Sequence, residues 1–303
     1  ADLYWQYFNQ NRYKFYNRTK TESKVDNEDF RTWDLETLFE EIHNHYQASL
    51  KNGLILQQTP IRDFDILLQT QKNSETFRPS VFDLLAHNAL SFYKTNENRI
   101  TKPAETFSIQ DEKFISPARK FSSLELKSSD SLALQYHALR IYQDLIQFHL
   151  KEDSSLALAQ VNIERLEFVK QNTNITNAQD VLLSTYIAER GFVKNKEAEA
   201  LYTYEIASIY YQQGSEFSQE NKENQWKIKE ALELCTQTTT QFPNSLGAEK
   251  CKTLSLQITK PQLQITTESF LRPNQTEKLL VSHKNTDVVD FKAYQLSKKQ
   301  YDA

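Results

Sequence analysis

The chain has 303 residues, of which 39% are hydrophobic, and a formal net charge of −4. This length favours two domains, and the scattered Lys and Arg residues argue against nucleic acid as a partner because no basic surface stands out. No apolar run approaches the roughly 20 residues that a membrane-spanning helix needs. Only four glycines occur, which is typical of a mainly α chain with short connections.

The first predicted region, residues 1–129, combines helices with irregular loops. Amphipathic helices are predicted from Asp34, a capping residue, to Leu50 and from Pro79 to Lys94. The polar segments 20–29 and 95–130 are predicted to be loops. The aromatic residues between Tyr4 and Tyr16 could form a binding surface, but packing between helices is the commoner use of such side chains.

The second region, residues 130–260, is predicted to consist of antiparallel helical hairpins. Apolar residues recur at helical spacing from Ser131 to Lys151, where Asp130 can cap the start. A second helix, which Asp153 and Ser154 can cap, carries Leu158, Val161, Leu166 and Val169. The short turn between the two helices predicts a hairpin.

A further hairpin is predicted from Glu197 to Gln213 and from Trp226 to Phe242, with the polar segment 215–225 as an exposed loop. Its sequence pattern resembles a tetratricopeptide repeat with a lengthened turn, although the repeat length departs from that family's period. The residues that carry this pattern are Ala207, Tyr210, Gly214, Ala231, Phe242-Pro243-Asn244-Ser245 and Ala248. Two unrelated helical hairpins remain the alternative.

The third region, residues 261–303, changes to β-structure. The segments 262–267 and 288–294 alternate with a period of two and contain β-branched or aromatic residues, and the segment 278–282 between them is interpreted as a further strand. Three strands at this spacing predict the opening of a β-sandwich. Since the sequence ends before a second sheet could form, we expect a fragment boundary here.

Residues suited to catalysis or metal binding are few and scattered. His43 and His45 lie two residues apart on a predicted helix, which directs them to nearly opposite faces, while His87, His137 and His149 are isolated and are interpreted as packing or hydrogen-bonded histidines. The sequence contains neither a Gly-x-Ser-x-Gly motif nor a glycine-rich phosphate loop. We therefore predict no catalytic residue, no metal site and no cofactor.

The two cysteines, Cys235 and Cys251, lie at similar distances on either side of the predicted turn 242–246. In an antiparallel hairpin they should face each other, and a disulfide is predicted. The bond would imply an oxidising compartment such as the periplasm or the cell surface. By the chain-entropy model it would contribute roughly 3 kcal/mol for a loop of about 15 residues. Two buried free thiols in a cytoplasmic protein are the alternative.

Several segments together are similar to the N-terminal region of alpha-2-macroglobulin family proteins of Bacteroidetes-type bacteria. They are Trp33-Asp34-Leu35, the run from Arg78 to Leu90, Glu164-Arg165-Leu166 and the stretch from Pro261 to Leu296. This resemblance implies a long, extracytoplasmic, lipid-anchored parent protein whose β-sandwich domains capture proteases or protect the envelope. The family's thioester motif pairs a Cys with a nearby Glu-Gln, and neither Cys235 nor Cys251 lies in such a motif.

The leading hypothesis is therefore a non-catalytic helical region of a macroglobulin-like, protease-inhibiting protein of the bacterial cell envelope, located in the periplasm or at the outer-membrane surface. The alternative is a helical-repeat scaffold that mediates protein–protein contacts in an outer-membrane or secretion assembly. Both expect proteins as partners. An uncharacterised hydrolase ranks below them because no coherent set of catalytic residues emerges.

Overall fold

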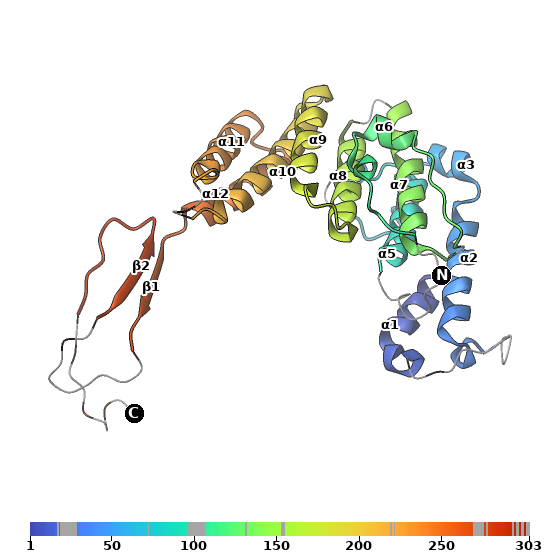
Figure 1. Ribbon diagram of the computed structural model, residues 1–303. Coiled ribbons are helices and arrows are strands. Elements are labelled where there is room, and N and C mark those ends of the chain that lie inside the picture. Colours follow the sequence, from blue (N-terminus) through green and yellow to red (C-terminus); the bar gives the residue numbers. More distant parts are fainter. Residues whose placement is uncertain are drawn as a thin grey trace.

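The structure is a computed structural model that describes most of the chain. The described residues are 1–16, 18, 29–71, 73–95, 107–130, 132–152, 155–218, 220, 222–268, 276, 278–292, 294, 297 and 300. These residues form a mainly helical protein with a small antiparallel sheet near the C-terminal end, which confirms the predicted fold class. The helices follow one another in a curved row, with the strand pair at one end (Figure 1).

The elements of the first region, residues 1–129, are helices of 3 to 16 residues. They are α1 (Asp2–Tyr16), η1 (Phe30–Thr32), α2 (Leu35–Leu50), α3 (Gly53–Gln58), η2 (Ile61–Phe64), α4 (Ser74–Phe77), α5 (Val81–Tyr93), η4 (Glu112–Ile115) and α6 (Ala118–Ser122), where η marks a 3-10 helix. As predicted, Asp34 caps α2, because its side chain accepts a hydrogen bond of 2.8 Å from the Thr37 amide. The predicted loop at 20–29 falls almost wholly outside the described residues.

The aromatic segment near the N-terminus forms α1 and packs inward. The Trp5 ring stacks on Phe8 at 5.4 Å between centroids, and both rings contact Phe39 of α2. Phe92 of α5 closes the cluster against Trp5 at 5.3 Å. Phe8 has no exposed surface. These contacts confirm packing between helices as the main role of these rings.

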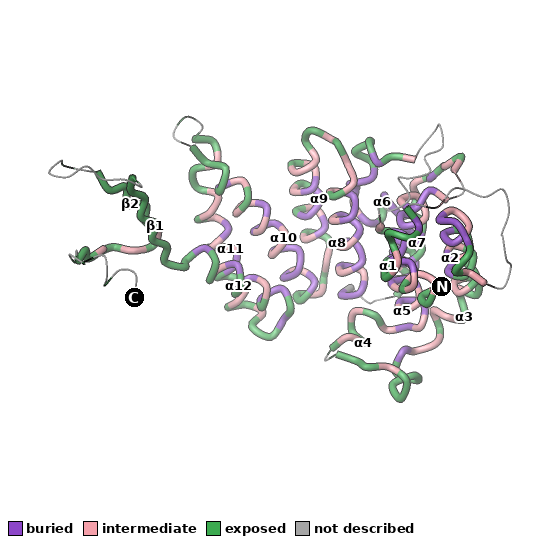
Figure 2. Tube along the Cα trace, turned by 90° about the horizontal axis from the view of Figure 1, so that it is seen from below, coloured by how far each residue is buried: buried purple, intermediate pink, exposed green. Residues whose placement is uncertain are grey.

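The remaining helices are 14 to 20 residues long, and each packs on the next one along the chain. They are α7 (Leu134–Lys151), α8 (Ser155–Asn172), α9 (Ala178–Phe192), α10 (Lys196–Ser215), α11 (Lys227–Gln241) and α12 (Leu246–Thr259). α7 packs on α8 as the predicted hairpin, and α10 packs on α9, α11 and α12. Buried residues are concentrated in the helices, whereas the strand pair is mainly exposed (Figure 2). The predicted caps at 153–154 lie outside the described residues.

Three predictions in this part of the chain need correction. The segment 95–130, predicted as a loop, contains η4 and α6, and the side chains of Phe114, Ile115 and Phe121 are buried there. Asp130 does not cap α7, since its carboxylate accepts a hydrogen bond from the Leu132 amide before the helix begins. Gly214 is the last residue but one of α10, so this helix runs past its predicted end. Ile228 of α11 packs so closely on Gly214 that a Cβ there would approach its Cγ1 to 2.6 Å.

The sheet consists of β1 (Gln262–Thr266) and β2 (Leu280–Lys284), paired antiparallel with Leu263 opposite His283 and Ile265 opposite Val281. The predicted strand at 288–294 was wrong: its described residues, 288–292 and 294, form no strand. Alternating residues alone do not make a strand, since each strand also needs a neighbouring backbone to accept its hydrogen bonds. The sandwich itself stays a prediction.

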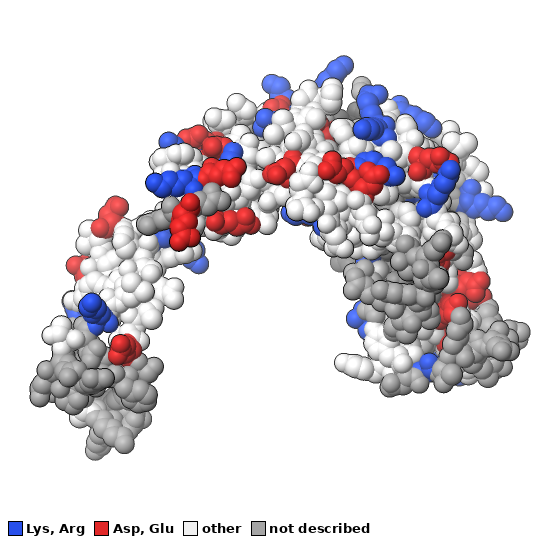
Figure 3. Space-filling model, in the orientation of Figure 1, with Lys and Arg blue, Asp and Glu red and all other residues white. Residues whose placement is uncertain are grey.

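Within the described part of the chain, every helix is too short or too polar to cross a membrane. This agrees with the absence of a long apolar run in the sequence. Basic and acidic side chains lie interspersed along the helical row on the face seen in Figure 3.

Candidate functional site

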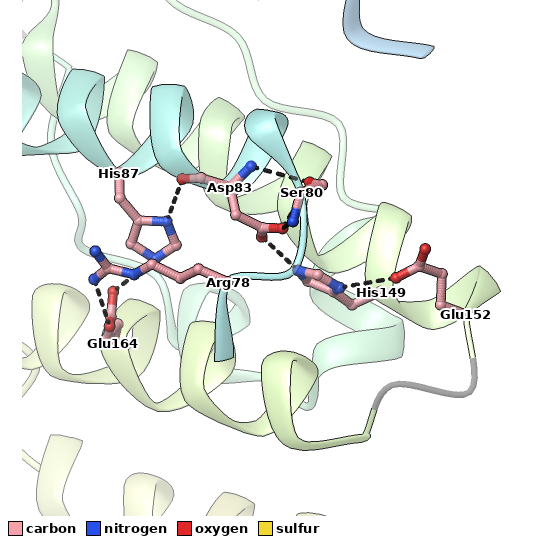
Figure 4. Close-up of polar contacts among 7 residues, drawn as sticks. All are labelled: Arg78, Ser80, Asp83, His87, His149, Glu152 and Glu164. Atoms are coloured by element: carbon pink, nitrogen blue, oxygen red, sulfur yellow. Dashed lines mark hydrogen bonds and ion pairs between the residues drawn. The ribbon is translucent and has the colours of Figure 1, made fainter. Parts of the chain in front are cut away.

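A group of polar side chains centred on the buried residues Asp83 and His149 lies where α5 begins. It comprises Arg78, Ser80, Asp83, His87, His149, Glu152 and Glu164, and we refer to it as the Asp83 cluster (Figure 4). Its residues come from the start of α5, the end of α7 and the middle of α8. The sequence places them up to 86 positions apart, from Arg78 to Glu164.

Asp83 occupies the centre of the cluster and forms a capping box with Ser80. The Ser80 amide and hydroxyl both donate to Asp83 Oδ2, at 3.0 and 2.7 Å, while the Asp83 amide donates to Ser80 Oγ at 3.2 Å. This exchange pairs the free amides of the first helical turn. One carboxylate oxygen of Asp83 is therefore fully engaged in holding the start of α5.

The other carboxylate oxygen binds His149 in the last turn of α7. His149 Nε2 lies 2.8 Å from Asp83 Oδ1, and its Nδ1 lies 3.5 Å from Glu152. The side chains of Asp83 and His149 are both completely buried. The contact joins α5 to α7.

His87 extends the cluster to α8. Its Nδ1 lies 2.7 Å from the Asp83 carbonyl oxygen, and its Nε2 lies 3.3 Å from Glu164. Arg78 approaches the same Glu164 carboxylate at 3.9 Å. Burial opposes ionisation of Glu164, but the neighbouring His87, Gln160 and Arg78 side chains outweigh it and lower the pKa of Glu164 to about 2. Glu164 is therefore ionised at neutral pH.

The side chains of the Asp83 cluster bond helices to one another, and none of them is arranged as an activated nucleophile. The Asp83–His149 pair has the geometry of a base and its orienting carboxylate. However, the Ser80 hydroxyl donates to Asp83 and not to His149, so it is not activated as a nucleophile. Since Ser80, Asp83 and His149 are also buried, the chemistry of the cluster is that of an interhelical anchor.

A second buried network surrounds Arg165 of α8, whose side chain has no exposed surface. Its guanidinium donates to the carbonyl oxygens of Phe114 at 2.7 Å and Ser116 at 2.9 Å, and to Asn162 Oδ1 at 2.5 Å. The guanidinium also lies 4.3 Å from the centre of the Phe121 ring. Burial lowers the pKa of Arg165 to about 10, which leaves it charged at neutral pH.

Helix α9 completes this network from the other side. Thr185 donates to the Ile115 carbonyl at 2.9 Å, and Glu189 accepts a hydrogen bond from the Ala118 amide at 2.5 Å. The segment 114–118 is thus held between α8 and α9 by its own backbone groups. This explains why a segment that lacks helical periodicity is ordered and buried.

The histidine pair predicted to diverge does so in the structure. His43 lies 2.9 Å from the Tyr93 hydroxyl and contacts the ring of His137 at 4.4 Å, whereas His45 contacts Tyr4. Burial and the adjacent charge of His137 lower the pKa of His43 to about 4. Among the described residues, no group of three or more His, Cys, Asp or Glu side chains could hold a metal ion.

The predicted cysteine pair lies at the α11–α12 contact. Cys235 and Cys251 are both completely buried and stand as free thiols. The hydrogen bond between the two thiols lowers the pKa of Cys235 and, together with burial, raises that of Cys251. The disulfide stays a prediction.

Sequence reasoning found the hairpin that carries the cysteines but missed both buried polar networks. Ser80-x-x-Asp83 is a recognisable capping pattern, and it was the only available signal for the Asp83 cluster. Nothing near His149 or Arg165 in the sequence indicates which distant groups they contact. Comparisons of the chain with protein-family models, with curated proteins and with solved structures found no match.

Proposed function

We propose that this chain is the non-catalytic helical N-terminal region of a large cell-envelope protein of the alpha-2-macroglobulin kind, which takes part in protease capture and envelope protection. The observation that carries this proposal is the strand pair that follows the last helix, because one of its faces is mostly apolar and its leucine and isoleucine side chains are half exposed. That face indicates what kind of domain the helices precede.

The register of the strands gathers most of the apolar side chains on one face. Leu263, Ile265 and Val281 share this face with His283, while the opposite face carries Leu280 among polar residues such as Gln264 and Ser282. Leu263 and Ile265 are 51% and 50% exposed. A sheet of two strands is marginal by itself, and antiparallel sheets bury their apolar face. A second sheet packed on this face would give the β-sandwich that the sequence predicts.

The helical row holds these strands at a defined place. Only Lys260 and Pro261 separate α12 from β1. Asn285, at the end of β2, donates to the Ile258 carbonyl at 2.7 Å and reaches the Lys260 carbonyl at 3.3 Å. Asn285 has a φ of 53°, which asparagine tolerates better than most residues. In this proposal, the helices serve as a spacer that orients the first β-domain.

The proposal places the protein in the periplasm or at the outer-membrane surface, anchored by lipid in the parent protein, with proteases as partners. Its test is the mass of the native polypeptide in membranes of the source organism, detected with an antibody against residues 130–260. We expect a mass several times that of the 303-residue chain. A mass equal to that of this chain would contradict the proposal.

A free-standing helical scaffold is the second candidate, and a separate observation favours it. Leu54, Ile55, Ile66 and Leu67 are exposed in and after α3, at 72%, 66%, 94% and 77%, and exposed apolar groups of this kind mark protein contacts. This candidate predicts a stable partner that copurifies with the wild-type chain and is lost from the I66S/L67S variant. A Y13S variant, altered at another exposed position, should retain it.

A further inference from the structure

The last helical hairpin is held together by small side chains at close range. Its buried core consists of Ala207, Ala231, Cys235, Cys251, Leu254 and Ile258. Next to it, Gly247 at the start of α12 lies so near α10 that a Cβ would come within 2.3 Å of the Ala200 backbone. Small residues let helices approach closely, and the two cysteines belong to the small core beside this contact.

The two thiols meet across the antiparallel helices α11 and α12. Both belong to the same buried core, where Thr238 acts on the Cys251 thiol and Ser255 on the Cys235 thiol. Neither sulfur-bearing residue has exposed surface. Two buried cysteines of one core, on packed helices joined by a short turn, are placed so that a bond between them needs no rearrangement of the fold.

We propose that Cys235 and Cys251 are joined by a disulfide that closes the α11–α12 hairpin covalently, and that the packed core then seals this bond against reducing agents. The inference does not depend on the macroglobulin proposal, since it concerns only residues of this hairpin. The bond would fix the helix from which β1 leaves, and so the place where the strand pair is attached.

The oxidation requires an acceptor for two electrons, and a small-molecule disulfide such as oxidised glutathione supplies it. A cysteine thiolate attacks one sulfur of that disulfide and releases one thiol molecule. The second cysteine then attacks the mixed disulfide, forms the Cys235–Cys251 bond and releases the other thiol molecule. The two cysteine protons account for the protons gained by these products. Because both cysteines are buried in the closed hairpin, the exchange takes place while the hairpin is open during folding.

The test compares full-length chains refolded with oxidised glutathione and with an excess of reductant. Each sample is alkylated in denaturant without further reductant, and its intact mass is measured. We expect the oxidised sample to be monomeric, to carry no alkyl group and to be lighter by two hydrogen atoms than the unmodified dithiol chain. Two alkylated cysteines, or a bond between chains, would overturn the proposal. Expression of the chain into an oxidising compartment gives the same readout without refolding.

A second measurement tests whether the packed core protects the disulfide from reductant. When reductant is added to the folded oxidised chain, we expect the bond to persist, and to be reduced once denaturant opens the hairpin. Rapid reduction at the same rate with and without denaturant would contradict this protection. The oxidised chain should also unfold at a higher urea concentration than the reduced chain. This difference should vanish in the C235A/C251A variant.

Discussion

The region from α1 to α8 and the hairpin α11–α12 are stabilised in different ways. The first has a large core rich in aromatic rings, with Phe8, Phe92, Tyr93 and Phe121 fully buried, and two buried polar networks that cross between helices. The second has a small core of alanine, cysteine and two aliphatic side chains, where backbones lie close together. The stability of the part from α1 to α8 should therefore be most sensitive to the loss of a polar group, and that of the hairpin α11–α12 to the gain of a methyl group.

The largest effect on stability is expected from R165M, in the part from α1 to α8. The change removes the donor that pairs the Phe114 and Ser116 carbonyls and leaves these buried acceptors unsatisfied. We expect the free energy of unfolding to fall by about 3 to 5 kcal/mol, as measured by urea denaturation. The R62M variant, at an exposed position of η2, serves as the control and should change little. A loss below about 1 kcal/mol would show that the network is dispensable.

The Asp83 cluster should be the next most sensitive place. D83A removes the capping box and the partner of the buried His149 side chain. We expect a loss of about 2 to 3 kcal/mol in the free energy of unfolding. D65A, which removes an exposed carboxylate just after η2, is the matched control. Equal stability of the two variants would mean that Asp83 does not anchor α5.

In the hairpin α11–α12, the substitution expected to destabilise the protein is one that adds a methyl group. G247A forces a Cβ against the Ala200 backbone, and overpacking of this kind costs about 1 to 3 kcal/mol. The same change at Gly191 in α9 meets no atom within 4 Å and should stabilise the helix by about 0.5 to 1 kcal/mol. Opposite shifts of the two unfolding midpoints are expected. If G247A and G191A shifted stability in the same direction, close packing of α12 on α10 would be disproved.

The smallest effects should appear in the pH dependence of stability, and they should have opposite signs at His43 in α2 and at Glu205 in α10. The pKa of His43 is lowered from 6.5 to about 4, so the unfolded chain binds more protons here and stability falls as the pH drops through this window. Burial raises the pKa of Glu205 in α10 from 4.5 to about 7, so its contribution is full below pH 4.5 and is lost as the pH rises toward 7.

Urea denaturation between pH 4 and pH 8 checks both signs. H43Q should reduce the loss of stability on acidification, and E205Q should reduce the loss on raising the pH. A profile for either variant that matches the wild-type profile would contradict the corresponding assignment.

The parts of the fold that the sequence predicted are those with local signals. Asp34 and its following apolar residues mark α2, and helical periodicity marks α7 and α8. Helix α9 escaped prediction because its buried positions include Thr185 and Glu189, which weaken the apolar pattern. These polar residues are buried because they bind the segment 114–118, which is about 70 residues away.

The candidate site was less predictable for the same reason. His149 was correctly interpreted as a hydrogen-bonded histidine, but its partner Asp83 lies 66 residues earlier. Local patterns reveal caps and amphipathic faces, whereas a buried ion pair depends on how the helices pack. The segment 288–294 is the opposite case: its sequence alternates clearly, yet its described residues form no strand.

Hydrogen exchange of the strand amides tests most directly whether the helical row presents an incomplete β-domain. The measurement compares the 303-residue chain with the native polypeptide isolated from membranes. We predict slow exchange in α7 to α10 of both samples, and fast exchange in β1 and β2 of the 303-residue chain that becomes slow in the native polypeptide. Strands that are equally protected in both samples would contradict the account, because their apolar face would then need no further partner.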